Sequence, residues 1–71
     1  RQKDLSNREM EVLKLFAEGV SNRQIADKLF ISVRTVETHK NNIMKKINLK
    51  TTVDLVKFAI KNNIIVLDWE A

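Results

Sequence analysis

The signal that most restricts the fold of this chain is a helix start that occurs three times within its first 36 residues. In the segments LSNREM, VSNRQI and ISVRTV, a serine (Ser6, Ser21 and Ser32) precedes a run of apolar residues with helical spacing. Three positions after each serine comes Glu, Gln or Thr, of which Glu and Gln complete a capping box and Thr is a weaker partner. Three such signatures in close succession predict a chain built from short helices.

The spacing of apolar residues predicts four helices, at about residues 7–18, 22–29, 33–47 and 52–61. Gly19 ends the first helix, because the left-handed residue that follows a helix is usually glycine. No segment alternates as strands do, so we expect an all-α, four-helix domain with a helix-turn-helix core. We expect the domain to comprise residues 5–65, with a linker remnant at 1–4 and a C-terminal tail at 66–71.

The composition excludes several classes of function. The 71 residues include no cysteine, which excludes disulfides and thiolate metal sites, and His39 is the single histidine. Because we find no nucleophile–base pair and no phosphate-cradling glycine loop, we expect no enzyme, no metal and no cofactor. The longest apolar run, IIVL, is too short to span a membrane. The lack of cysteine fits a reducing compartment, and we expect a cytoplasmic protein.

Positive charge is concentrated in one part of the chain. The sequence has 13 Lys and Arg residues against nine Asp and Glu, a formal net charge of +4. Residues 32–50 contain five of these basic residues and one acid, Glu37, so this segment alone accounts for the excess. A localised basic face indicates a polyanionic partner. On charge alone, a solvated face on an ordinary helix is an equally good interpretation.

A short helix, a tight connector and a longer basic helix together predict a helix-turn-helix, whose second helix enters the major groove of DNA. If Val36, Ile43 and Ile47 of the longer helix face the core, its opposite side carries only polar and charged residues. We call these residues the recognition ridge: Arg34, Glu37, Thr38, Asn41 and Lys45. Their side chains are of types that bind base edges or phosphates, and their spacing follows one side of a helix.

An acid in the middle of a basic helix has three interpretations. Glu37 could accept a hydrogen bond from cytosine N4, or pair with Lys40 or Asn41 within the helix. It could also repel phosphates where the groove contact is wrong. We favour a role in choosing the base, because Thr38 and Asn41 share the same side of the helix.

The other ridge residues also have alternatives. Asn41 could form a bidentate pair with adenine, and Thr38 could contact a thymine methyl group or a base edge, although either could simply be solvated. Arg34 and Lys45 are expected to contact phosphates.

The segment from Leu5 to Val56 closely resembles the LuxR-type helix-turn-helix domain of NarL/FixJ response regulators. The elements that carry this resemblance are LSxRE at 5–9, VL at 12–13, EG at 18–19, SN at 21–22, IA at 25–26, Leu29, IS at 31–32, TV at 35–36, His39, Ile43, Lys46 and Leu49. The resemblance extends over about residues 5–65 and implies an effector domain that binds double-stranded DNA in bacterial transcription regulation. At one position, Phe30, the family often has glycine, so the conformation of this turn is left open.

The resemblance also implies roles for individual residues. Base contacts are expected from Glu37, Thr38 and Asn41. Contacts with the DNA backbone are expected around Asn22, Arg23, Thr35, His39 and Lys45, in addition to Arg34 from the ridge. RNA polymerase is a further candidate partner.

The fourth helix has two apolar stripes. The resemblance implies that this helix forms the dimer contact, and we expect a homodimer on DNA through Val53, Val56 and Ile60. The alternative is that this stripe belongs to the core of a single copy. For the whole domain, the alternative to DNA binding is a helical module whose basic face docks an acidic protein.

Overall fold

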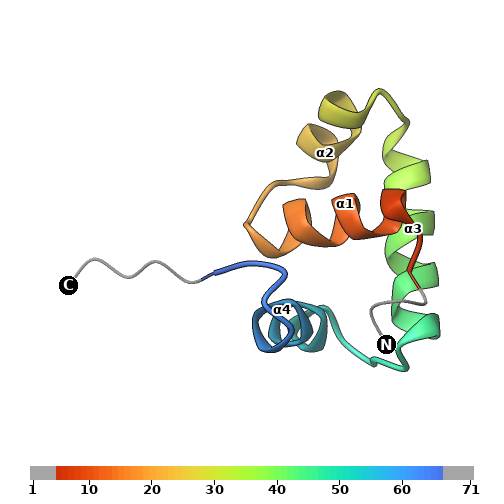
Figure 1. Cartoon of the computed structure of the whole chain (residues 1–71). Helices are drawn as coiled ribbons and strands as arrows, with labels where there is room; N and C mark the ends of the chain where they lie inside the picture. The colour runs from red at the N-terminus through yellow and green to blue at the C-terminus, as the bar shows by residue number, and fades with distance from the viewer. Residues whose placement is uncertain (1–4, 67–71) are drawn as a thin grey trace.

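The computed structural model describes residues 5–66, and these residues form four α-helices and no strand (Figure 1). The helices are α1 (Asn7–Ala17), α2 (Asn22–Leu29), α3 (Val33–Lys46) and α4 (Thr52–Lys61). The all-α, four-helix prediction is confirmed, and α2 and α4 have the predicted bounds. Helices α1 and α3 each end one residue earlier than predicted, because Glu18 and Ile47 are their C-cap residues.

The first two helices begin with complete capping boxes, as predicted. Ser6 Oγ accepts a hydrogen bond from the Glu9 N–H at 3.1 Å, and the Glu9 carboxylate accepts one from the Ser6 N–H at 2.9 Å. Ser21 and Gln24 make the same reciprocal pair at the start of α2. Each box satisfies backbone donors that the helix itself leaves without partners, and so fixes where the helix begins.

The other two helices begin with simpler caps. Ser32 accepts from the Thr35 N–H at 3.0 Å, but the short Thr35 side chain reaches only the Ser32 hydroxyl, at 2.8 Å, and leaves the backbone of Ser32 unbonded to it. The cap of α4 was not predicted from the sequence. There, Thr51 Oγ1 accepts from the Asp54 N–H at 3.1 Å.

All four helices end in the same way. Each is followed by a residue in the left-handed backbone conformation, with φ between 58° and 92°: Gly19, Phe30, Asn48 and Asn63. The next residue donates its N–H to a carbonyl five residues back, at 2.8–3.1 Å, as in a Schellman motif. These donors are half-buried apolar residues that pack against the core: Val20, Ile31, Leu49 and Ile64. Three of the left-handed residues are glycine or asparagine, which tolerate this conformation, whereas Phe30 is not.

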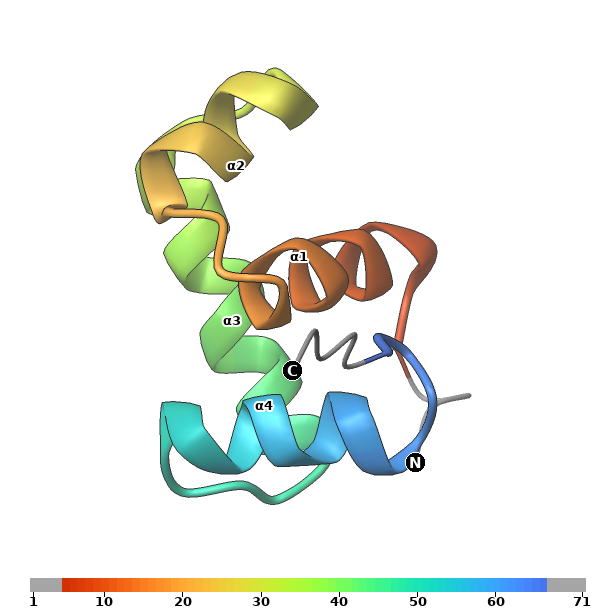
Figure 2. The ribbon, with the colours of Figure 1, turned by 90° about the vertical axis from the view of Figure 1, so that its left-hand side faces the viewer.

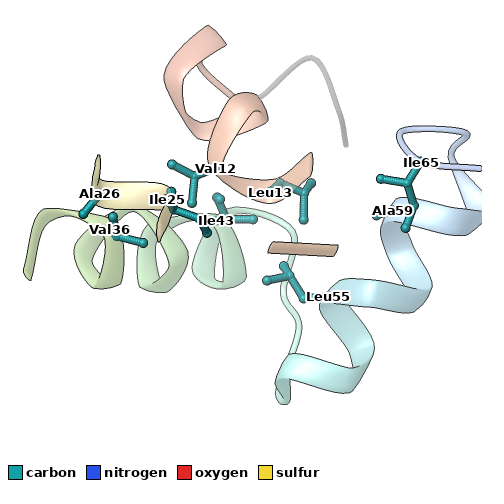
Figure 3. Packing of buried hydrophobic residues seen from close by; sticks show 9 residues of the cluster. All are labelled: Val12, Leu13, Ile25, Ala26, Val36, Ile43, Leu55, Ala59 and Ile65. Atoms are coloured by element: carbon teal, nitrogen blue, oxygen red, sulfur yellow. The ribbon is translucent and has the colours of Figure 1, made fainter. Parts of the chain in front are cut away.

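Helix α1 is central to the arrangement and contacts the other three helices. Figures 1 and 2 show α2 on one side of α1 and α4 on the other, with α3 running past α1 from the α2 side toward the α4 side. The buried side chains between them form one core, drawn in Figure 3: Val12, Leu13, Ile25, Ala26, Val36, Ile43, Leu55, Ala59 and Ile65. Ile65 follows α4 and lies in this core, whereas the next residue, Val66, is 82% exposed.

The buried carboxylate of Glu9 connects the start of α1 to the end of α3. The Glu9 side chain lies at the start of α1, and the residue is only 4% exposed. Lys46 Nζ, at the last residue of α3, donates a hydrogen bond to Glu9 Oε1 at 2.7 Å. Burial alone raises the pKa of the Glu9 carboxyl, but hydrogen bonds from Lys46 and Ser6 and the Lys46 charge together lower this pKa below its ordinary value. The Glu9 side chain therefore acts both as a cap and as the anchor for the end of α3.

Candidate nucleic-acid interface

The recognition ridge is exposed along one side of α3. Val36 and Ile43 are fully buried, and Ile47 is half-buried against the core, so the apolar side of the helix faces inward as predicted. All five ridge residues are exposed. In Figure 1, α3 forms one edge of the molecule, with α1 and α2 to one side of it. The exposure that groove insertion requires is therefore present, while the individual DNA contacts remain predictions.

Three cations among the predicted backbone contacts have no side-chain partner within residues 5–66. Arg23, Arg34 and Lys45 are exposed and make no ion pair or side-chain hydrogen bond with any other residue in 5–66. A phosphate that approached them would displace only water. Thr35 and His39, two further predicted backbone contacts, are half-buried, and the Thr35 hydroxyl is already bonded to Ser32.

Thr38 has its only hydroxyl hydrogen committed to the helix. Its Oγ1 donates to the backbone carbonyl of Arg34 at 3.0 Å. A threonine hydroxyl has one donor and two acceptor lone pairs, so toward a groove Thr38 presents an acceptor and a methyl group. It can thus accept from an exocyclic amino group or touch a thymine methyl, but it cannot donate to a purine N7 while this bond persists.

Glu37 does not form the internal pair considered above. Its carboxylate makes no hydrogen bond or ion pair with the residues that the structure describes. Like Thr38 beside it, an ionised Glu37 offers only acceptors. Neighbouring positions of the ridge therefore share one hydrogen-bonding polarity. Asn41, also exposed, offers both donors and acceptors.

Two lysines of α3 are engaged inside the domain. Lys46 is held by Glu9. Lys40 Nζ donates to Asn22 Oδ1 at 3.2 Å and lies 3.8 Å from the centroid of the Phe16 ring. Burial lowers the pKa of Lys40, and the nearby charge of Glu37 opposes this shift. The sequence could not reveal either contact, because the partners lie 18 and 37 residues apart in the chain and no local pattern links them.

The predicted dimer stripe of α4 is only partly covered. Leu55 and Ala59, on the other stripe, are fully buried, so α4 uses that side for the core. Val53 is 60% exposed, and Val56 and Ile60 are half-buried. This distribution leaves apolar surface on α4, and contact with a second copy stays a prediction.

The described residues show no other site chemistry. Within 5–66, no three His, Cys, Asp or Glu side chains are grouped so that they could hold a metal ion. None of the described helices is long and apolar enough to cross a membrane.

Comparison with known families and structures places this geometry in context. The family model described as "Bacterial regulatory proteins, luxR family" matches residues 3–59. The oxygen regulatory protein NreC of Staphylococcus carnosus (strain TM300) is 52% identical over 61 residues, which are 86% of this chain and 28% of that protein. NreC of Staphylococcus epidermidis (strain ATCC 12228) is 52% identical over 63 residues, 89% of this chain and 29% of that protein.

Two crystal structures of response regulators share the fold. ChrA, from a heme-sensing two-component system, aligns with a TM-score of 0.75 and 41% identity over 86% of this chain and 30% of its own. Full-length FixJ from B. japonicum aligns with a TM-score of 0.80 and 33% identity over 90% of this chain and 32% of its own. The chain thus spans less than a third of the length of these relatives.

Proposed function

The chain belongs to the luxR family of bacterial regulatory proteins, and we propose that it is the sequence-specific DNA-binding effector domain of a two-component response regulator. The observation that carries this proposal is the recognition ridge. It is exposed along α3, and its own cations, Arg34 and Lys45, make no ion pair or side-chain hydrogen bond with any other residue in 5–66. The similarity to NreC, ChrA and FixJ supports the same proposal.

In the proposed complex, α3 lies in the major groove and its ridge meets the base edges. Glu37 and Thr38 present acceptors, which suit the amino groups of cytosine N4 and adenine N6. Asn41 can pair with adenine through both ends of its amide. Arg23, Arg34 and Lys45 neutralise phosphates, with Asn22, Thr35 and His39 as further backbone contacts.

Several features of the whole protein belong to the same proposal. Two copies meet through Val53, Val56 and Ile60 of α4, and their half-sites are then spaced by about 34 Å, one turn of DNA. The domain works in the cytoplasm, contacts RNA polymerase once bound, and has no catalytic role of its own. A separate regulatory domain of the same protein controls dimerisation or access to α3.

Selection of bound duplexes from a random pool tests this function. The expected result is one enriched motif with two half-sites a helical turn apart. Binding that is weak and without sequence preference in the presence of competitor DNA would refute it, and would favour docking of the basic face to an acidic protein.

Glu37→Gln, titrated against the selected site and each of its single-base variants, tests base readout. We expect discrimination to be lost at one position. A uniform gain in affinity on every sequence would show that Glu37 only repels phosphate.

A further inference from the structure

Lys40 differs from the other cations of α3 in where its charge is placed. Its ammonium group lies between three helices, since it donates to Asn22 Oδ1 of α2 at 3.2 Å and sits 3.8 Å from the Phe16 ring of α1. The side chain is half-buried, whereas Arg34 and Lys45 on the same helix are exposed. An ammonium held by both a carbonyl oxygen and an aromatic face is not free to follow a phosphate.

The contact also determines what Asn22 can offer to DNA. Asn22 is the first residue of α2, immediately after the Ser21 cap, and lies beside Arg23, a cation with no partner within residues 5–66. A side-chain amide has one oxygen and one NH₂ group. Because the oxygen accepts from Lys40, the two N–H donors remain, and these are the groups that bind a phosphate.

From this arrangement we propose that Lys40 is a positioning residue for DNA binding, which orients the Asn22 amide with its NH₂ group toward a phosphate and does not contact DNA itself. The inference rests on the proposed function. In this proposal, the Lys40 charge serves to hold a side chain of α2 in place against α3, the two helices of the helix-turn-helix.

Salt dependence separates this role from direct phosphate contact. The affinity of the whole chain for a short duplex recovered from the random pool is measured by fluorescence anisotropy between about 50 and 200 mM salt. Lys40→Met keeps the length and the packing over Phe16 but removes the donor. We expect it to weaken binding about three- to tenfold with an unchanged slope of log affinity against log salt. The matched control, Lys45→Met on the exposed ridge, lowers the steepness of this slope by about 0.9.

Two Asn22 variants test the orientation itself. Asn22→Asp keeps an acceptor for Lys40 and adds an acid in the first turn of α2, so thermal stability is expected to be equal or higher. It removes the NH₂ donors and sets a negative charge against the phosphate, so affinity falls at least about tenfold. In an Asn22→Ala background, Lys40→Met is expected to cost no further affinity, because the group that it orients is gone.

Three results would overturn the assignment. A slope reduced by about 0.9 in Lys40→Met would mean direct phosphate contact. Unchanged affinity in Lys40→Met, or wild-type affinity in Asn22→Asp, would mean that the pair plays no part in binding. Failure of the proposed function looks different, since the wild-type domain would then bind the selected duplex no more tightly than an unrelated duplex of the same length.

Discussion

Replacing the one large aromatic residue at the turn of the helix-turn-helix should make the protein more stable. Phe30 has φ 59° and is 94% exposed, so its side chain contributes almost no burial while its Cβ is strained. The left-handed conformation costs a residue with a Cβ about 1–2 kcal/mol. Glycine removes this cost but loses about 0.5–1 kcal/mol through the greater freedom of the unfolded chain. The midpoints of these two ranges differ by about 0.75 kcal/mol, which is the expected net gain for Phe30→Gly.

Urea unfolding and thermal melts followed by circular dichroism measure this gain, which corresponds to a Tm increase of roughly 2–8 °C for a domain of this size. Phe30→Ala is the matched control, because it removes the ring but keeps the Cβ. It should unfold within about 0.5 kcal/mol of the wild type. A Phe30→Gly protein that is no more stable, or a Phe30→Ala protein weakened by more than about 1 kcal/mol, would refute the reasoning, since the ring would then be packing in solution.

Further outcomes follow from the same structure. Gly19→Ala should have the opposite sign in the same melts and lose about 1 kcal/mol, because φ is 92° there while an added Cβ meets no atom within 4 Å. Lys46→Met should lose about 1–2 kcal/mol, between the values for exposed and buried pairs because the Lys46 side chain is 41% exposed, whereas Lys45→Met should be nearly neutral. Native Glu9 holds its proton less tightly than unfolded Glu9, so stability in urea should fall as pH drops through 4.5 and below, and Glu9→Gln should flatten this slope. Thr38→Val should cost about fivefold in preference for an amino-bearing base, measured on single-base variants, while Thr38→Ser retains it.

The starts of the helices were predictable from the sequence because capping is local. A hydroxyl and a partner three residues later satisfy backbone donors without help from the rest of the fold, so Ser6 and Ser21 could be identified directly. The cap at Thr51 was not predicted, because the residue three positions later is Asp54 and not the glutamate or glutamine of a capping box.

The ends of the helices were less visible. Gly19 was identified, and an asparagine followed by an apolar residue could have revealed the ends at Asn48 and Asn63. The end at Phe30 could not be predicted from the local sequence, because phenylalanine rarely adopts a left-handed backbone conformation. There, the packing of Ile31 against the core and its bond to the Ala26 carbonyl, at 3.0 Å, override the preference of the residue.

In the candidate site, too, features set by neighbouring residues could be predicted, whereas contacts between residues far apart in the chain could not. Helical periodicity alone separated the buried Val36 and Ile43 from the exposed ridge. It could not separate Lys45, which has no side-chain partner within residues 5–66, from Lys46, which reaches a carboxylate 37 residues away in the chain. Such contacts depend on how α1 crosses α3, and a single sequence contains no direct record of that crossing.

This separation changes how the basic segment should be understood. Residues 32–50 have a net charge of +4, but Lys46 neutralises Glu9 and Lys40 is held by Asn22 and Phe16. The cations of this segment that are exposed and make no ion pair or side-chain hydrogen bond with another residue in 5–66 are Arg34, Lys45 and Lys50. Glu37 therefore stands among fewer unengaged cations than the sequence suggests, and its carboxylate makes no hydrogen bond or ion pair with the described residues. In the proposed complex, the number of phosphates that residues 32–50 neutralise is therefore set by how the fold divides their lysines, and the net charge of this segment overstates that number.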